Sequence, residues 1–328
     1  MTGRPAHVLA QGAVERAAAA LRAGEVVAFP TETVYGLGAD AANVAAVQRV
    51  YALKGRPAGH PLIVHLQGVD ELARWAAHVP PAARRLAARF WPGPLTLVLP
   101  RASAVADAVT GGQDSVALRV PAHPVARALL AAFGAAIAAP SANRYGRVSP
   151  TSAAHVREEF GEAVPIVLDG GECEVGLEST IVSCLDGLVL LRPGAIVLPE
   201  LEAAAGVAVR RATRGEGPRA PGTTAAHYAP RTPLRLVPPG ALPGVAAGTD
   251  VAVLARGAAP QGFRGRLWIE AGDEAGRYGH ALYANLRRLD RVAAAAILVE
   301  AVPEGVAWEA VRDRLARAAA ACAEERLP

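Results

Sequence analysis

Lys54 is the residue of this chain that most clearly suggests chemistry, because it is the only lysine among 34 basic residues and all the others are arginine. A lysine ammonium is a compact cation, whereas an arginine guanidinium is a wide planar fork. The segment Lys54-Gly55-Arg56-Pro57 sets both kinds of cation beside a flexible glycine and a rigid proline. This arrangement favours an anion-binding loop. The alternative is a lysine retained by chance that complements the dipole at the end of a helix.

Further polar clusters stand next to short apolar runs, where loops leave the ends of predicted strands. Strand ends are where α/β sheets build ligand sites. Together the clusters supply hydroxyls, amides and well-separated cations, an inventory that suits a polyphosphate and a small polar substrate. The segments are 30–38, 54–57 with His65, 140–143, 149–151, 178–180 and 192–194, and the cations are Lys54, Arg56, Arg119 and Arg192, with Arg147 as a fifth.

Taken one at a time, these residues also have ordinary structural interpretations. Thr33 fits a turn, and Ser141 and Asn143 fit an Asx-type turn. His65 fits a hydrogen-bonded core histidine, and Arg192 fits a solvated charge at a sheet edge. The sequence has no GxxxxGK[ST] loop, no GxGxxG after a predicted strand, and no HExxH or GxSxG motif. P-loop, dinucleotide-binding and common hydrolase mechanisms therefore lack support.

The elements that must position these residues alternate between β-like apolar runs and alanine-rich helical stretches, the pattern of an α/β fold. Asp186-Gly187 is a strong hairpin signal and predicts an antiparallel pair within a mixed sheet. An apolar stripe on the second helix leaves Lys54 at its exposed last turn. Strands are predicted at 26–29, 62–66, 95–99, 116–120, 136–139, 166–168, 180–184 and 188–191, and helices at 14–23, 44–53, 82–90, 125–133 and 153–160.

A second, smaller α/β domain is predicted after a stretch rich in arginine, glycine, proline and threonine. We place the first domain at 1–210, the linker at 211–232 and the second domain at 233–328. The linker is interpreted either as a lid over the site or as an ordinary tether. Strands of the second domain are predicted at 234–237, 251–255, 267–269 and 296–299, and helices at 280–289 and 308–320.

Charge and cysteine content narrow the function classes. A net charge of +4 fits binding to phosphates or RNA without requiring either. Cys173, Cys184 and Cys322 form no CxxC pair, which indicates neither a zinc site nor a disulfide framework and leaves packing as their role. The sequence shows no secretion signal and no apolar run of about 18–20 residues. We therefore expect a cytoplasmic protein that does not enter a membrane.

At its polar clusters the sequence resembles the YrdC-like family of threonylcarbamoyl-AMP synthases, in the long, two-domain form. The resemblance spans nearly all of residues 8–200 and continues through the linker, and an ordered series of motifs is more specific than any one of them. The matching segments are PTETVYGLG (30–38), KGRP (54–57), PLIVH (61–65), PGPLTLVL (92–99), RVP (119–121), PSAN (140–143), SPT (149–151), ESTIV (178–182), LRPG (191–194) and APGTTAAHYAP (220–230).

The resemblance implies a twisted mixed β-sheet domain with flanking helices and a smaller, C-terminal Rossmann-like α/β domain. It implies a nucleotidyltransferase that forms threonylcarbamoyl-AMP and pyrophosphate from L-threonine, bicarbonate and ATP, with Mg²⁺ accompanying ATP. The product would pass to a downstream tRNA threonylcarbamoyl transferase, and weak tRNA binding by the chain itself stays open.

The resemblance also assigns site residues by position, with Lys54 and Arg56 as the catalytic pair and with no metal ligands. His60 stands where related sequences often have asparagine. ATP is assigned to Lys54, Arg56, His60, Ser141, Asn143, Ser149, Arg192 and Tyr228, and threonine to Thr33, His65, Arg119, Ser141 and Thr180.

Two other functions compete with this one. The first is a non-catalytic RNA-binding module, which the mildly basic charge allows. The second is a carbamoyltransferase of the hydrogenase-maturation or antibiotic-tailoring type, which shares the domain. Such proteins have further catalytic modules, and the maturation type has cysteine-rich zinc fingers that this chain lacks.

Overall fold

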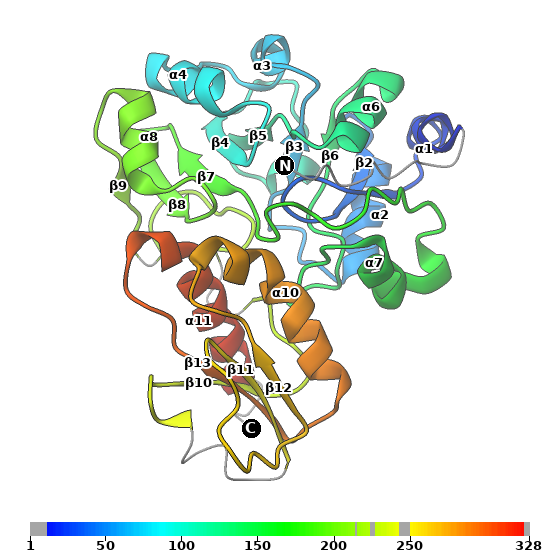
Figure 1. Cartoon of the computed structure of the whole chain (residues 1–328). Helices are drawn as coiled ribbons and strands as arrows, with labels where there is room; N and C mark the ends of the chain where they lie inside the picture. The colour runs from blue at the N-terminus through cyan, green and yellow to red at the C-terminus, as the bar shows by residue number, and fades with distance from the viewer. Residues whose placement is uncertain (1–11, 214, 224–226, 243–249, 325–328) are drawn as a thin grey trace.

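The computed structural model describes residues 12–213, 215–223, 227–242 and 250–324, and two sheets organise them (Figure 1). Within these ranges a nine-stranded mixed sheet has the order β1-β2-β6-β3-β5-β4-β7-β8-β9, and a four-stranded sheet has the order β10-β13-β11-β12. Every pairing in the smaller sheet is parallel. The predicted mixed sheet followed by a small Rossmann-like α/β unit is thus confirmed.

The strands of the large sheet include two that the sequence did not predict: β2, which begins inside the 30–38 motif, and the short β9. Residues 166–168, predicted as a strand, instead form an isolated bridge from Val167 to Ala28. The large sheet consists of β1 Val27–Phe29, β2 Gly36–Asp40, β3 Ile63–His65, β4 Leu95–Pro100, β5 Ser115–Arg119, β6 Ile137–Ala138, β7 Thr180–Ser183, β8 Val189–Arg192 and β9 Arg210–Arg211. The small sheet consists of β10 Leu234–Val237, β11 Val251–Ala255, β12 Leu267–Glu270 and β13 Ala296–Glu300.

All the predicted helices are present, and the described residues also form α3, α5 and α8, which were not predicted because they are short or lack a strong apolar period. The helices are α1 Ala13–Arg22, α2 Val44–Lys54, α3 Leu72–Trp75, α4 Pro81–Phe90, α5 Asp107–Thr110, α6 Pro124–Phe133, α7 Ala153–Phe160, α8 Leu198–Ala205, α10 Ala275–Arg291 and α11 Glu309–Glu324. Gly55, Gly134 and Gly206 end α2, α6 and α8 in the left-handed conformation that glycine adopts without steric cost.

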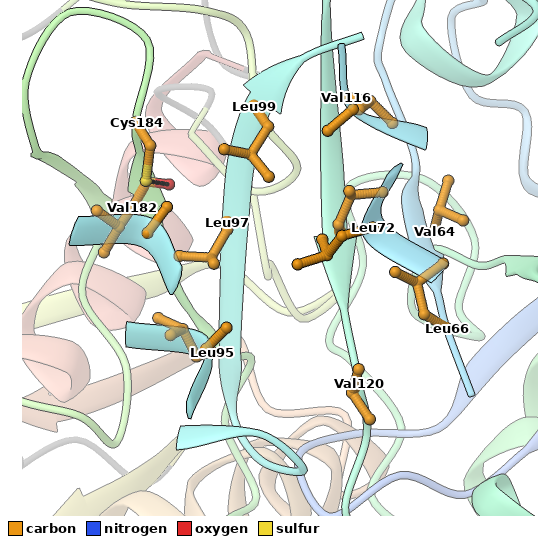
Figure 2. Close-up of a cluster of buried hydrophobic side chains, with 14 of the residues drawn as sticks. Val64, Leu66, Leu72, Leu95, Leu97, Leu99, Val116, Val120, Val182 and Cys184 are labelled. Carbon is orange, nitrogen blue, oxygen red and sulfur yellow. Dashed lines mark hydrogen bonds between the residues drawn. The ribbon is translucent and has the colours of Figure 1, made fainter. Parts of the chain in front are cut away.

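Side chains of the central strands alternate between two faces of the large sheet, as a period of two requires. Figure 2 shows the first face, where Val64, Leu97 and Val182 pack in a cluster with residues of α3, α4, α5 and α8. Ile63, Val98 and Ile181 point to the opposite face and pack with Ala220 of the predicted linker. At these central strands the second face therefore packs against the linker.

A β-bulge in the predicted hairpin turns Arg192 toward the linker-covered face. The strands β7 and β8 are antiparallel, as Asp186-Gly187 predicts, but the register shifts between Ile181 and Val182. Val182 pairs with Leu190, whereas Ile181 pairs with Arg192, so Leu191 is the extra residue. Because paired residues share a face, Arg192 lies on the face of Ile181. Arg192 is 2% exposed, which excludes a solvated edge charge.

Lys54 is buried, and the prediction that it lies at an exposed helix end was wrong. Its side chain is at the last turn of α2 as expected, but it is only 3% exposed. The reason is tertiary: the loop at 140–143 packs over the end of α2. The Lys54 ammonium donates hydrogen bonds to the backbone oxygens of Ser141, at 2.6 Å, and Asn143.

The two halves of the chain share one hydrophobic cluster. Val34, Val148 and Leu177 of the first half pack with residues of the small unit, including Leu282 of α10 and Val311 of α11. In Figure 1, α10 and α11 lie on the side of the small sheet that faces the large unit. The strand β9 pairs with β8, so the large sheet reaches into the predicted linker. None of the described helices is long and apolar enough to cross a membrane.

Candidate active site

A cavity of about 40 Å³ lies where the linker-covered face meets the ends of β3, β5 and β8. Residues from most of the predicted polar clusters line it, although they are far apart in the sequence. The large sheet therefore brings the clusters together, as strand-end placement predicts. The predicted site residues in its wall are Thr33, Arg56, His65, Arg119, Ser141, Arg192 and Tyr228.

Other predicted site residues lie outside the lining. Lys54 and Asn143 do not line the cavity, but the Lys54 ammonium donates hydrogen bonds to the backbone oxygens of Asn143 and of Ser141, which does line it. Ser149 donates to the carboxylate of Glu178 at 2.6 Å. The Thr180 hydroxyl donates to the backbone oxygen of Ile196 at 3.0 Å, which fixes the turn after β8 and directs this side chain away from the cavity.

His60, the remaining predicted residue, lines a neighbouring and larger cavity. Its Nδ1 lies 3.1 Å from the hydroxyl of Tyr145, and its backbone oxygen accepts from Arg56 at 3.3 Å. His60 therefore contacts Arg56 through its main chain and not through its ring.

One end of the cavity is built by the paired strands β3 and β5. His65 and Arg119 are direct partners in the parallel register, so their side chains share a face. Arg119 donates to the Thr33 hydroxyl at 2.8 Å and forms an ion pair with Glu32 at 2.7 Å. Burial alone would raise the pKa of Glu32, but Arg119 lowers it below its usual range. This end therefore contains a fixed, charge-balanced guanidinium beside hydroxyl groups.

His65 is neutral at this end of the cavity. Burial, and then the charge of Arg119, lowers its pKa to about 3. Its Nδ1 has no hydrogen-bond partner among the described residues. A buried polar atom without a partner costs free energy, and a bound polar ligand would remove that cost. His65 is thus placed to hydrogen-bond a ligand and is a poor base at neutral pH.

The other end gathers cations that point at neutral backbone oxygens. Arg56 donates to Pro61 O at 2.9 Å. Arg192 donates to the backbone oxygens of Ser179, at 2.9 Å, and Pro221, at 2.6 Å. Burial lowers the pKa values of Arg56 and Arg192, and lowers that of Lys54 well below its usual range. An anionic ligand would interact more strongly with these desolvated cations than carbonyl oxygens do.

The linker forms part of the cavity wall. Pro221, Gly222, His227 and Tyr228 all line it, which an ordinary tether would not do. Burial lowers the pKa of His227 to about 3, so this ring is also neutral. Tyr228 has φ 64°, an unfavourable value for a residue with a side chain, and its hydroxyl lacks a partner among the described residues. The linker thus closes over the site in a conformation that its contacts must stabilise.

Several residues in or next to the cavity wall were not predicted as site residues. Glu178 and Ser179 line the cavity, and the ESTIV motif that contains them was the available signal. Tyr283 and Arg314 of the small unit contact Glu178. No sequence signal pointed to Arg314, because it is one of many arginines in an alanine-rich helix.

The described residues contain no group of three or more histidine, cysteine, aspartate or glutamate side chains that could hold a metal ion. Among the described residues of the cavity wall Glu178 is the only acid, and its oxygens already accept from Ser149, Tyr283 and Arg314. Since Mg²⁺ needs available oxygen ligands, this wall does not fit a metal held by the protein alone.

Comparison with known proteins places this site in a family. Residues 19–194 match the Sua5_yciO_yrdC family model, described as telomere recombination, and residues 196–320 match the model of the threonylcarbamoyl-AMP synthase C-terminal domain. The threonylcarbamoyl-AMP synthase of Pyrococcus abyssi is 41% identical over 319 residues, which are 92% of each chain. The chain belongs to the threonylcarbamoyl-AMP synthase family.

Two further relatives agree with this assignment. The threonylcarbamoyl-AMP synthase of Bacillus subtilis is 47% identical over 228 residues, which are 68% of this chain and 66% of that protein. The crystal structure of P. abyssi Sua5 complexed with L-threonine superposes with a TM-score of 0.88, at 39% identity and over 94% of both chains. The two-domain fold and the nucleotidyltransferase activity predicted from the resemblance are thereby confirmed.

Proposed function

We propose that the cavity is the place where this threonylcarbamoyl-AMP synthase condenses L-threonine, bicarbonate and ATP into threonylcarbamoyl-AMP and pyrophosphate. The observation that carries the proposal is the pairing of two chemically different ends in one cavity. One end has hydroxyls, a neutral histidine and a balanced arginine, and the other has desolvated cations. The first suits an amino acid and the second a polyphosphate.

Threonine is proposed to bind at the end formed by Thr33, His65 and Arg119. Arg119 offers a guanidinium to the amino acid's carboxylate, and its ion pair with Glu32 holds it in place. The vacant hydrogen-bonding atom of His65 meets a polar group of the substrate. The proposal leaves out Thr180, because its hydroxyl is engaged with Ile196.

The chemistry follows from the substrates. Bicarbonate and the threonine amine first form an N-carboxy compound with loss of water. Its carboxylate then attacks the α-phosphorus of ATP, and the bond from that phosphorus to the bridging oxygen of pyrophosphate breaks. A carboxylate is already ionised at neutral pH, so this step needs no strong base from the protein. Positioning and charge stabilisation by Lys54, Arg56 and Arg192 are proposed to accelerate it.

The linker is proposed to act as a lid. A cavity of about 40 Å³ holds a few water molecules at most and is far too small for ATP. Pro221, Gly222 and Tyr228 are therefore proposed to move when the nucleotide enters. Their return would exclude water from a product that water would hydrolyse.

Mg²⁺ is proposed to enter as part of the substrate, MgATP, bound to phosphate oxygens. The acid-poor cavity wall supports this arrangement. We further propose that the product passes in the cytoplasm to a tRNA threonylcarbamoyl transferase. The net charge of +4 is compatible with weak contact to that tRNA.

The test is pyrophosphate release by the purified chain with ATP. We expect release that requires L-threonine and bicarbonate together, and much less with serine in place of threonine. His65→Ala should raise the KM for threonine about tenfold or more, because the substrate then loses a buried hydrogen-bond partner. Pyrophosphate release that is independent of threonine would contradict the proposal, as would salt-dependent tRNA binding without any ATP consumption.

A further inference from the structure

Glu178 at the cavity is held by two side chains of the small unit. One carboxylate oxygen accepts from Ser149, while the other accepts from the Tyr283 hydroxyl and from Arg314 Nε, both at 2.8 Å. Burial would raise the pKa of Glu178, but Arg314 and then Arg192 lower it to about 2. The carboxylate is therefore ionised and fixed at neutral pH, and two of its three donors come from α10 and α11.

Arg314 is buried more deeply than domain packing alone explains. Its side chain is completely buried and also pairs with Asp313 at 2.6 Å. Burying a guanidinium costs desolvation free energy, and apolar residues pack two domains together without that cost. The buried charge of Arg314 is balanced here by the carboxylates of Glu178 and Asp313.

The same two residues hold the linker. The guanidinium of Arg314 lies 5.3 Å from the centroid of the Tyr228 ring, a cation–π contact. The Tyr283 ring stacks on Tyr228 with centroids 5.7 Å apart. These contacts support the unfavourable backbone conformation of Tyr228 described above. The small unit therefore contacts both Glu178 and Tyr228, the linker residue in the cavity wall.

The contact of Arg314 with Glu178 affects the charge balance of the cavity. Arg119 is balanced by Glu32 from its own domain, but Glu178 and Arg192 influence each other's pKa across the ATP end. A carboxylate without a counter-ion of its own would attract Arg192 and repel phosphate oxygens. Arg314 supplies that counter-ion from the other domain.

We propose that Arg314 and Tyr283 are positioning residues for the ATP half of the reaction: they neutralise and fix Glu178, so that Arg192 stays available to phosphate, and they hold Tyr228 at the cavity. The inference rests on the proposed function of the cavity. It gives the C-terminal domain a part in catalysis that a structural appendage would not have.

The experiment measures pyrophosphate release by the full-length chain while ATP and threonine are varied separately. Arg314→Met keeps the aliphatic stem and removes the charge. We expect the KM for ATP to rise about tenfold or more and the KM for threonine to stay within about twofold. The double variant Arg314→Met/Glu178→Gln has no carboxylate at position 178, so no counter-ion is needed there. Its KM for ATP should therefore lie within about threefold of the KM for ATP of Glu178→Gln alone.

Arg277→Met is the matched control, because Arg277 lies exposed on α10 and its ion pair is with Glu274, the N-cap residue of the same helix. It should leave both constants unchanged. Should Arg314→Met fail to fold, Tyr283→Phe removes one hydroxyl and should raise the KM for ATP about threefold to tenfold with threonine unaffected.

The outcomes separate the two proposals. No threonine-dependent release by the wild type would overturn the proposed function and this inference with it. An active wild type in which Arg314→Met changes the constants for both substrates equally would overturn the inference alone, as would an Arg314→Met defect that Glu178→Gln does not relieve.

Discussion

At the scale of single residues, the solitary lysine now has a physical setting. Lys54 donates to the backbone oxygens of Ser141 and Asn143 in a buried contact beneath the cavity wall. Burial, and then the neighbouring charge of Arg56, lowers its pKa. An ammonium with three donors fits between two carbonyl oxygens, whereas a guanidinium is wider and needs up to five acceptors. A phosphate that binds nearby would relieve the cost of both buried cations.

Lys54→Ala is therefore expected to reduce pyrophosphate release about 100-fold or more, and Lys54→Arg about tenfold or more despite keeping the charge. The measurement is kcat/KM for ATP in the assay proposed above. Arg49→Ala is the control, since Arg49 lies on the same helix with its side chain 54% exposed, and it should act like the wild type. Turnover near the wild-type level by Lys54→Arg would refute the need for a compact cation.

At the scale of elements, glycines in the motif at 30–38 allow β2 to pack against its neighbours. A Cβ on Gly38 would lie 2.7 Å from Phe29 Cε1 and equally close to Ile137 Cγ2. Both are buried core side chains with no room to move. The second glycine of the motif is thus required by close packing between β1, β2 and β6, which in turn holds Thr33 at the cavity.

Gly38→Ala is expected to destabilise the fold by about 1–3 kcal/mol through overpacking. Gly59→Ala should change stability far less, because no atom lies within 4 Å of the corresponding Cβ. Urea unfolding followed by circular dichroism compares the two variants. Equal midpoints would mean that the core adjusts to the extra methyl group.

The linker depends on a second glycine for a different reason. Gly222 has φ +73°, and a Cβ there would lie 2.0 Å from the Tyr228 hydroxyl and 2.9 Å from Arg192 Nη1. Tyr228 cannot move aside easily because its ring is stacked on Tyr283. Both the backbone conformation and the close approach therefore favour glycine at this position.

Gly222→Ala should lower pyrophosphate release about tenfold or more by displacing the lid. Gly215→Ala is a matched control, because Gly215 has a similar φ of +82° and its Cβ would meet nothing within 4 Å. Gly215→Ala should lower the free energy of unfolding by about 1 kcal/mol, the cost of placing a residue with a Cβ in the left-handed conformation. Similar turnover for the two variants would show that the contact with Tyr228 is not needed for activity.

At the scale of the whole molecule, the two halves are joined by a shared hydrophobic cluster and by buried polar contacts, including those of Glu178 with Tyr283 and Arg314 and that of Arg287 with Val148. The neutral histidines His65 and His227 lie within this closed structure, each with a folded-state pKa of about 3. An unfolded chain protonates its histidines near pH 6.5, well before the folded chain does. Protons therefore bind preferentially to the unfolded state as the pH falls.

Stability is consequently expected to be full above pH 6.5 and to fall as the pH drops from there toward 3. Each histidine should remove about 2 kcal/mol of unfolding free energy by pH 5. Glu178 has a folded-state pKa of about 2, lowered from the usual glutamate value of 4.5. Its protonation should therefore reduce stability only below about pH 4.5. Urea unfolding from pH 8 to pH 5 measures the effect, and His227→Gln should reduce the loss by about 2 kcal/mol. His155, whose pKa is lowered to about 4, adds to the total loss. A flat profile between pH 7 and pH 5 would contradict the burial of these rings.

The sequence by itself determined features whose causes are local. Glycines that end helices act within one turn, Asp186-Gly187 acts within one hairpin, and alternating apolar residues mark strands without reference to the rest of the chain. The alternation of apolar runs with helical stretches, together with the hairpin signal, therefore predicted the mixed sheet and a smaller α/β domain. The motifs at strand ends predicted many residues of the cavity wall. The ordered motifs also identified the family before the comparisons confirmed it.

Only the tertiary structure decided what long-range packing controls. Lys54 is buried because a loop some 87 residues away covers it, and Arg192 reaches the cavity because a bulge shifts the register of β8. The contact of Arg314 with Glu178 joins residues 136 apart. Burial, register and charge pairing depend on contacts between segments that are far apart in the sequence. The local pattern of amino acids does not determine which of these segments come into contact.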